Sequence, residues 1–393
     1  MTLLAESAPS PHSTLGVTVL GSTGSVGRQT LDVIAHHPDR FRVVALAAGS
    51  NLALLQDQIA RHHPTLVAVD QESAEPGAAL DHPAILRGHD GLIAAATHPD
   101  VDVVVVATSG HSAIIPTARA IEAGKTIALA NKETIVCAGE LIVPLAHTHG
   151  VTIRPIDSEH SAIWQSLGNA RGQDVERLIL TASGGPFRTM PAEQIANVTV
   201  EDALDHPTWK MGGKITIDSA TMMNKGLELI EAHWLFDVPY GRIDVLVHPE
   251  SIIHSLVEFR DGSQIAQLSL PDMRLPIQYA LTYPDHLPGP CRRLSLAEVG
   301  ALHFEPPDVE RFPALRLARD AGVAGSTYPT VLSAADEVAV DAFVGGRIAF
   351  PTIAEIVARA LDAHRPETGL SWESIAAADR WGRATAIGLL PSP

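Results

Sequence analysis

The sequence predicts an α/β fold in three parts: a doubly wound N-terminal domain, a central α+β domain and a C-terminal helical domain. In the first part, short β-branched runs alternate with helical stretches, which is typical of a parallel sheet covered by helices on both faces. The middle of the chain has strands joined by a hairpin signal, and the last part has helical patterns. At 393 residues, the chain is long enough to form two or three domains with their own cores.

Composition and charge exclude several classes of protein. The chain has 28 Lys and Arg against 45 Asp and Glu, and a net charge of -17 argues against nucleic acid as a partner. Two cysteines, Cys137 and Cys291, are too few for a disulfide framework and fit a reducing cytoplasm. The most apolar stretch, 101–108, is far shorter than the roughly 20 residues of a membrane-spanning helix. The N-terminus, 1–15, lacks the pattern of a secretory signal. We therefore expect a soluble cytoplasmic protein with a frayed N-terminal tail.

The first domain is expected over residues 1–160. Each expected strand is a short run of β-branched and small apolar residues, and helical periodicity separates several of them. The expected strands are 17–20, 42–47, 66–69, 103–107, 126–129 and 151–155, and the expected helices include 26–36, 52–62 and 114–123.

The second domain is expected over residues 161–290, with a small mixed sheet. Asp261-Gly262 predicts a hairpin between its last two strands. A connecting stretch is expected at 291–313 and a helical domain at 314–393, where Gly345-Gly346 ends one helix and Pro351 begins another. The expected strands are 177–182, 242–248, 251–259 and 264–270, and the expected helices are 224–235, 328–344, 351–363 and 372–386.

A glycine-rich motif with Gly21, Gly24 and Gly27 stands directly between a strand and a helix. Glycines at these positions permit a tight turn and let a pyrophosphate approach backbone N–H groups at the positive end of the helix. The motif therefore predicts a Rossmann-like dinucleotide site. The alternative is a structural turn with no ligand.

The end of the second strand indicates which dinucleotide binds. An NAD site usually has Asp or Glu about 20 residues after the glycines, whereas this strand ends in Ala47-Ala48-Gly49-Ser50-Asn51. Neutral donors at Gly49, Ser50 and Asn51 favour NADP(H). The same residues can also begin the next helix with Ser50 or Asn51 as its N-cap, and the two interpretations are compatible.

Charged residues follow two later strands of the first domain. Asn131-Lys132-Glu133 comes after the strand 126–129, where ligands of open α/β sheets bind, although such a pair is most often a solvated surface pair. Asp157 and Glu159 come after the strand 151–155, and in an extended segment alternate side chains share a face. Two carboxylates on one face make a plausible site for Mg²⁺ or Mn²⁺. The alternative is a helix N-cap.

The helix 224–235 offers a third carboxylate. Asn224, Lys225 and Glu228 lie three and four residues apart, so one face presents an amide, an ammonium and a carboxylate together. Glu231 lies next on that face and competes with Glu228 for the role of metal ligand.

Three more segments carry polar groups suited to a substrate. Ser183-Gly184-Gly185-Pro186 is a glycine-rich strand exit that can bind a phosphate, and 219–221 adds hydroxyl donors. The segment 206–213 contains Trp209 and has the composition of a mobile lid. For Trp209, the alternative is an ordinary, partly buried anchor.

Taken in order, these motifs resemble the 1-deoxy-D-xylulose 5-phosphate reductoisomerase family. The matching stretches cover nearly all of the first two domains, and the block 214–236 is long enough to be highly specific. They are 21–27, 130–133, 157–162, 181–187, 206–213, 218–231 and 248–255.

The resemblance implies a homodimeric enzyme of isoprenoid-precursor synthesis by the non-mevalonate route. Such an enzyme rearranges 1-deoxy-D-xylulose 5-phosphate and reduces the resulting aldehyde with NADPH to 2-C-methyl-D-erythritol 4-phosphate. His206 and His254 are candidate proton carriers, and Ser50 stands where a basic residue would bind a 2′-phosphate more firmly.

By motif position, the resemblance also implies the site residues. The metal ligands are Asp157, Glu159 and Glu228, and the catalytic residues are Lys132, Glu159, His206 and Glu228. The substrate is bound by Lys132, Ser158, Glu159, Ser183, His206, Trp209, Ser219, Asn224, Lys225 and Glu228. NADPH is bound by Thr23, Gly24, Ser25, Val26, Gly49, Ser50, Asn51, Asn131, Glu133 and Gly212.

Two other functions fit parts of the sequence. A different two-domain NADP-dependent reductase, acting on another carbonyl compound, would not need the three carboxylates, and its turnover would be insensitive to a chelator. A non-catalytic NADPH sensor would be unaffected by Glu228→Gln. The many polar groups between Ser183 and Glu228 argue against a sensor, which has no need of them.

Overall fold

The computed structural model describes residues 14–69, 80–168, 170, 172–366 and 369–391, so the expected N-terminal tail lies largely outside the described residues. The chain forms two compact units. The first unit contains the residues up to 134 together with 142–161 and 272–292. The second contains 135–141, 162–271 and the residues from 293 onward.

A parallel seven-stranded sheet forms the centre of the first unit, and its order is β4-β3-β2-β1-β5-β6-β7. Its inner strands are runs of buried Val, Ile, Leu and Ala, as expected for a sheet covered on both faces. The strands are β1 (Leu15–Leu20), β2 (Phe41–Ala48), β3 (Leu66–Val69), β4 (Ile85–Arg87), β5 (Val103–Val106), β6 (Thr126–Leu129) and β7 (Ile153–Pro155). The predicted parallel sheet is confirmed.

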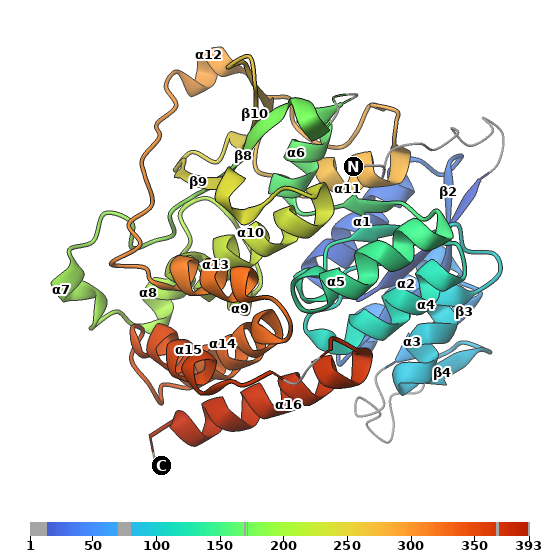
Figure 1. The fold of residues 1–393 in the computed structure, drawn as a ribbon. Helices are drawn as coiled ribbons and strands as arrows, with labels where there is room; N and C mark the ends of the chain where they lie inside the picture. The colour runs from blue at the N-terminus through green and yellow to red at the C-terminus, as the bar shows by residue number, and fades with distance from the viewer. Residues whose placement is uncertain (1–13, 70–79, 169, 171, 367–368, 392–393) are drawn as a thin grey trace. The chain divides into compact units, whose positions relative to one another are not determined.

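The strand order reverses between β1 and β5, which both pair in parallel with their neighbours. Right-handed crossovers then place the helices before and after this reversal on opposite faces of the sheet. Helices α3 and α4 lie together in Figure 1. The helices are α1 (Ser25–His36), α2 (Leu52–His62), α3 (Gly88–Thr97), α4 (Ile114–Glu122, after the short helix His111–Ala113) and α5 (Lys132–His149).

Helix α11 (Arg274–Thr282) returns to the first unit and packs on α1. Its buried residues Ile277, Ala280 and Leu281 belong to the same hydrophobic core as strands β1, β2 and β5. Arg154 on β7 donates from Nη1 to the carbonyl oxygen of Ala280 at 2.9 Å. Residues 272–290 were expected in the central domain, and the structure places them in the first unit.

A mixed four-stranded sheet, in the order β11-β10-β8-β9, forms part of the second unit. Strands β8 and β9 are parallel, and β10 is antiparallel to both of its neighbours. The turn at Asp261-Gly262 joins β10 to β11, which confirms the predicted hairpin. The strands are β8 (Val175–Ala182), β9 (Ile243–Val247), β10 (Ile253–Phe259) and β11 (Gln264–Leu268).

The C-terminal helices belong to the same unit as this sheet and do not form a separate one. Helix α10 packs on α13, and the Cβ of Ala318 reaches Gly226 so closely that a side chain at residue 226 would collide with it. The helices are α6 (Ser158–Leu167), α9 (Gly213–Thr221), α10 (Met223–Phe236), α13 (Ala314–Ala324), α14 (Tyr328–Val344), α15 (Thr352–Ala363) and α16 (Trp372–Leu389).

The expected connecting stretch 291–313 carries some regular structure. It contains a short helix, and Glu305 forms an isolated antiparallel bridge with Val247. The remaining short helices of the unit are α7 (Ala192–Ile195), α8 (Val200–Leu204), α12 (Leu296–Val299) and two 3₁₀ turns at Gly172–Asp174 and Tyr240–Arg242. Among the described residues, no helix has the length and hydropathy needed to cross a membrane.

Candidate active site

The glycine loop after β1 has the backbone geometry of a phosphate-binding turn. Gly21 has φ of 84°, a conformation that favours glycine. A Cβ on Gly27 would lie only 2.6 Å from the Cα of Ser22 and would also collide with the carbonyl of Gly21. Gly24 caps α1 without a side-chain hydrogen bond, so the first N–H groups of this helix are available to an anion.

Helix α2 fixes the position of this loop. The hydroxyl of Ser22 donates to Oε1 of Gln58 at 2.7 Å, and Nε2 of Gln58 donates to the carbonyl of Ser22 at 2.8 Å. Both side chains are buried. These two hydrogen bonds therefore hold the glycine loop against α2.

A pocket of about 510 Å³ opens beside the glycine loop. It lies at the carboxyl ends of β1, β2 and β5, where the strand order reverses and where open α/β sheets bind their ligands. Its walls are Gly21, Thr23, Gly24, Ala47, Ala48, Gly49, Ser50, Asn51, Gly88, His89, Leu92, Ala107, Thr108, Ser109 and Ser112.

Sequence reasoning missed half of this pocket. Gly88, His89 and Leu92 come from the start of α3, which was not predicted. Thr108, Ser109 and Ser112 follow β5, where small polar residues directly after a buried strand carry the same signal as those at the other strand ends.

Asn51 has the N-cap role that the sequence allowed. Its Oδ1 accepts a hydrogen bond from the backbone N–H of Leu54 at 3.1 Å, and Asn51 also lines the pocket. The side-chain amide nitrogen of Asn51 is not used in this cap, so one residue can both begin α2 and face a ligand.

Lys132, Asp157 and His160 come together in the first unit. Nζ of Lys132 forms an ion pair with Oδ2 of Asp157, and Nδ1 of His160 lies 3.5 Å from the same oxygen. Burial alone would raise the pKa of Asp157. The charge of Lys132 and the contact with His160 outweigh it, and the pKa lies well below its ordinary value. Asp157 is therefore ionised at neutral pH.

Lys132 and Glu133 lie in the first turn of α5, which Asn131 caps through Oδ1. One local prediction in this part of the chain was wrong. Glu159 does not continue a strand, because α6 begins at Ser158. Asp157 and Glu159 therefore do not share a face by strand alternation, and Asp157 stands directly before the helix, as in the N-cap alternative.

Asn131 and Ser158 make hydrogen bonds next to these charges. Nδ2 of Asn131 lies 3.0 Å from the carbonyl oxygens of Thr108 and Gly110 and 2.9 Å from Oε2 of Glu133. Ser158 donates from Oγ to Oε2 of Glu159 at 2.6 Å. Asn131 thus connects the start of α5 to the loop that lines the dinucleotide pocket.

In the second unit, α10 has the shared face that the residue spacing predicted. Nδ2 of Asn224 donates to Oε1 of Glu228 at 2.6 Å, and Nζ of Lys225 contacts Oε2 of the same carboxylate. Lys225 and Glu228 are buried. Glu231, one turn later, is buried as well.

Ser183 and His206 form the second polar group of this unit. Nδ1 of His206 accepts backbone N–H groups from Thr208 at 3.1 Å and Trp209 at 2.9 Å, so the ring proton is on Nε2. Nε2 then donates to Oγ of Ser183 at 2.9 Å. Oγ also accepts the N–H of Gly185 at 3.2 Å, so the Ser183 hydroxyl keeps its own proton for a ligand. Burial lowers the pKa of His206, which keeps the ring neutral at pH 7.

Ser219 lies next to the Ser183 loop. Gly185 has φ of 69°, and a Cβ there would lie 2.8 Å from the carbonyl oxygen of Ser219. Helix α9 ends two residues later, and Met222 in the left-handed conformation turns the chain directly into α10. This sharp turn connects Ser219 to Asn224 and Lys225 over a few residues.

The lid predicted over 206–213 ends one residue earlier in the structure. Gly213 is already the first residue of α9, so the loop covers 205–212. The Trp209 side chain is half-buried, and its ring centre lies 6.0 Å from that of His254. Trp209 therefore has a packing partner, as its alternative interpretation expected.

Comparisons with known proteins show the family of this chain. The family model described as 1-deoxy-D-xylulose 5-phosphate reductoisomerase matches residues 17–139. Models of two C-terminal domains of the same enzyme match residues 153–236 and 268–385. Together the three models match residues of both units.

Similar proteins carry the same name. The 1-deoxy-D-xylulose 5-phosphate reductoisomerase of Thermomicrobium roseum is 57% identical over 96% of this chain and 98% of its own, and that of Geotalea uraniireducens is 55% identical over 95% and 97%. The Zymomonas mobilis enzyme in complex with NADPH has a TM-score of 0.88 at 42% identity, covering 97% of this chain and 100% of its own. A reductoisomerase in complex with NADPH, fosmidomycin and magnesium has a TM-score of 0.89 at 41% identity, covering 95% and 98%. The chain belongs to the 1-deoxy-D-xylulose 5-phosphate reductoisomerase family.

Proposed function

We propose that this protein converts 1-deoxy-D-xylulose 5-phosphate to 2-C-methyl-D-erythritol 4-phosphate by NADPH-dependent, divalent-metal-assisted rearrangement and reduction. This reaction provides a precursor of isoprenoids by the non-mevalonate route. The observation that carries the proposal is the cluster of Ser183, His206 and Ser219, because a dinucleotide pocket alone would serve many reductases.

The residues of the pocket fit NADPH. The uncapped N-terminus of α1 suits the pyrophosphate, and Ser50 and Asn51 at the end of β2 offer neutral donors to a 2′-phosphate. Bound NADPH supplies the hydride. Thr23, Ser25, Val26, Gly49, Asn131, Glu133 and Gly212 would complete its site.

The chemistry of the carboxylates fits a hard divalent cation, Mg²⁺ or Mn²⁺. We propose Asp157, Glu159 and Glu228 as its ligands. Lys132 supports this role because it keeps Asp157 ionised. A cation held by these residues would supply polarisation of the substrate carbonyl and a lower pKa of the neighbouring hydroxyl, which rearrangement of the carbon skeleton requires.

The second unit supplies the groups for the substrate's phosphate. The hydroxyls of Ser183 and Ser219, the amide of Asn224 and the ammonium of Lys225 are suitable donors to a dianion. Glu228 orients Asn224 and Lys225 through the hydrogen bonds described above. Binding energy from this remote phosphate helps to order the reacting end of the substrate.

Several other residues act closer to the reacting carbons. Lys132 and Ser158 would donate to the substrate's oxygens, and Lys132 would stabilise negative charge that develops on them. Closure of the loop 205–212, with Trp209, would exclude water during reduction. His206 and His254 are the candidates for proton transfer.

A spectrophotometric assay tests this function. Purified protein with 1-deoxy-D-xylulose 5-phosphate and Mg²⁺ or Mn²⁺ should oxidise NADPH, and a chelator should abolish the reaction. Glu228→Gln should lower kcat at least a hundredfold without unfolding the protein, because glutamine still accepts from Asn224. Glu193→Gln, on an exposed residue of α7, is the matched control and should be fully active.

The alternative functions give different results in this assay. Chelator-insensitive oxidation with another carbonyl substrate would indicate a different NADP-dependent reductase. NADPH binding without oxidation, unchanged by Glu228→Gln, would indicate a sensor.

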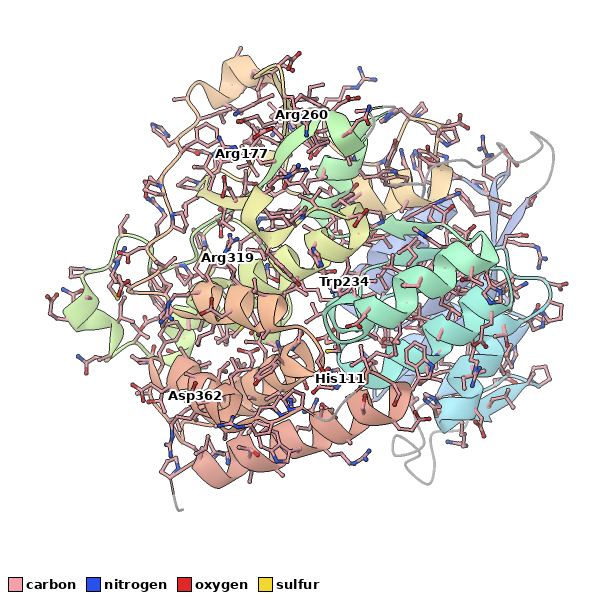
Figure 2. All side chains as sticks on the ribbon, viewed as in Figure 1. His111, Arg177, Trp234, Arg260, Arg319 and Asp362 are labelled. Carbon is pink, nitrogen blue, oxygen red and sulfur yellow. The ribbon has the colours of Figure 1, made fainter. Side chains whose placement is uncertain are left out.

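We also propose that the enzyme is a cytoplasmic homodimer that associates through one face of the four-stranded sheet. Helix α10 packs against β8, where Leu178 and Leu180 are buried, whereas Leu246 and Leu256 of the other face are only half-buried. Arg177, labelled in Figure 2, links β8 to Asp244 on β9 at 2.7 Å and to Glu258 on β10 at 3.0 Å. This face of the sheet combines half-buried apolar side chains with paired charges.

Light scattering after gel filtration tests the dimer. The wild-type protein should have twice the mass of the chain, and Leu256→Glu should be monomeric at micromolar concentration. Val323→Glu, at a position 66% exposed on α13, should remain dimeric. A monomeric wild-type protein would contradict the proposal.

A further inference from the structure

A cluster of three charged residues, two of them buried carboxyl groups, connects α9 to α14. Nζ of Lys214 lies 2.5 Å from Oδ2 of Asp218, one turn later on α9, and 2.9 Å from Oδ2 of Asp336 on α14. Asp218 is 3% exposed and Asp336 is completely buried. None of these residues belongs to the proposed catalytic site.

The cluster has two carboxyl groups for one ammonium, whereas a simple ion pair has one of each. Oδ1 of both Asp218 and Asp336 is buried and has no hydrogen-bond partner among the described residues. Burial and the charge of Asp336 raise the pKa of Asp218 well above its ordinary value, and the ammonium of Lys214 offsets only part of this shift.

Burying these charged groups costs desolvation free energy, and an apolar contact at the same place would not have this cost. Replacing a buried ion pair by apolar residues is often neutral or stabilising, so a buried charge group is poor evidence for a role in stability. Its hydrogen bonds do impose one orientation on the two helices. Lys214 and Asp218 lie on one face of α9, and the contact of Lys214 with Asp336 turns that face toward α14.

Helix α9 carries a residue of the proposed phosphate site at one end and the lid at the other. Ser219 lies in its last turn, where its carbonyl is in close contact with Gly185 of the Ser183 loop. Gly212 is its N-cap, directly after the loop that contains Trp209. A rotation of α9 would therefore change the separation of Ser219 from Ser183.

We propose that Asp336 is a positioning residue of the enzyme, which binds Lys214 and so orients α9 for recognition of the substrate's phosphate. This inference rests on the proposed function, because it concerns the same phosphate site. It gives the C-terminal helices a role in substrate affinity, although they contribute no residue to the proposed active site.

Two variants of the full-length protein remove the contact in different ways. Asp336→Asn removes the charge that Lys214 binds, and Lys214→Met removes the ammonium but keeps the length of the aliphatic chain. Both should raise the Kd for inorganic phosphate and the KM for 1-deoxy-D-xylulose 5-phosphate about tenfold, with a smaller change in kcat. The Kd for NADPH should change less than twofold.

Two further variants are controls. Asp218→Asn leaves Lys214 bound to Asp336 as an ordinary pair, so it should weaken phosphate binding less than twofold. Asp341→Asn, at an exposed position of the same helix α14, should bind phosphate as the wild type does.

Several outcomes would overturn the inference. It is wrong if folded Asp336→Asn or Lys214→Met binds phosphate like the wild type, or if Asp218→Asn is affected as strongly as they are. It is also wrong if NADPH binding weakens in parallel, because that would indicate a general loss of structure. If Asp336→Asn does not fold, the Kd of Lys214→Met for inorganic phosphate tests the inference. Failure of the wild type to turn over the sugar phosphate would refute the proposed function alone, because phosphate binding is measured without turnover.

Discussion

Gly27 leaves no room for a side chain beneath the glycine loop. The nearest atoms belong to the backbone of Gly21 and Ser22, which cannot rotate away as a flexible side chain would. Gly27→Ala should therefore destabilise the protein by about 1–3 kcal/mol and weaken NADPH binding at least tenfold. Urea unfolding and fluorescence titration with NADPH measure the two effects.

A second glycine is the control for this substitution. Gly388 on α16 has open space where its Cβ would lie, so Gly388→Ala should leave NADPH binding unchanged. Equal effects of the two substitutions on NADPH affinity would contradict the role assigned to Gly27.

At single residues, the sequence predicted contacts best where the spacing lies within one helix. Asn224, Lys225 and Glu228 meet as their three- and four-residue separations require. The contact of Asp336 with Lys214 joins residues 122 positions apart, and no local pattern signals it. The prediction for Asp157 and Glu159 failed for a different reason. It assumed the side-chain alternation of a strand, whereas a helix begins at Ser158.

The neutral imidazole ring of His206 accepts two of the hydrogen bonds that hold the loop 205–212. Nδ1 of His206 accepts the N–H groups of Thr208 and Trp209, and a proton on Nδ1 would remove both hydrogen bonds. The pKa of His206 is lowered by burial below the ordinary 6.5. The unfolded chain therefore takes up this proton first as the pH falls, and the folded state loses stability below about pH 6.5.

Unfolding in urea at pH 7.5 and pH 5.5 tests this loop. The loss of unfolding free energy between the two values should be smaller in His206→Gln than in the wild type. His149→Gln, at an exposed position near the end of α5, should behave as the wild type. An unchanged pH dependence in His206→Gln would show that the ring does not titrate in this way.

Among the elements, most strands and the longer amphipathic helices followed their sequence patterns, and several helices did not. Helix α9 contains Ile215, Thr216 and Ile217, whose β-branched side chains favour a strand. Helix α5 has Pro144 in its interior, and α3 contains two glycines. These helices form because packing in the folded protein outweighs weak local propensity.

At the scale of the whole molecule, the dinucleotide pocket is built from segments far apart in the chain. The loop after β1, the end of β2 and the start of α3 all line it. NADPH at a hundredfold excess over its Kd should stabilise the protein by about 2.7 kcal/mol. Hydrogen exchange should slow at 21–27, 47–51 and 88–92 together.

The outcome for α3 is the most informative part of this experiment. Sequence reasoning did not assign 88–92 to the cofactor site, so protection there would support the observed pocket independently. Protection at the glycine loop alone would indicate that bound NADPH does not contact residues 88–92.

The sequence also could not predict which parts of the chain pack together. The return of 272–292 to the first unit depends on contacts between Ile277, Ala280 or Leu281 and a core formed much earlier in the chain. Hydrophobic periodicity shows that α11 has a buried face but not which surface it meets.

The chain passes between its two units at five places: 134/135, 141/142, 161/162, 271/272 and 292/293. Neither unit is therefore encoded by one uninterrupted stretch of the gene. A fragment that ends at residue 161 would lack α11 and leave the apolar surface that this helix covers open to water. In evolution, the dinucleotide-binding unit of this protein could not be exchanged for another by a single recombination event, as it can be where a cofactor domain forms a continuous block.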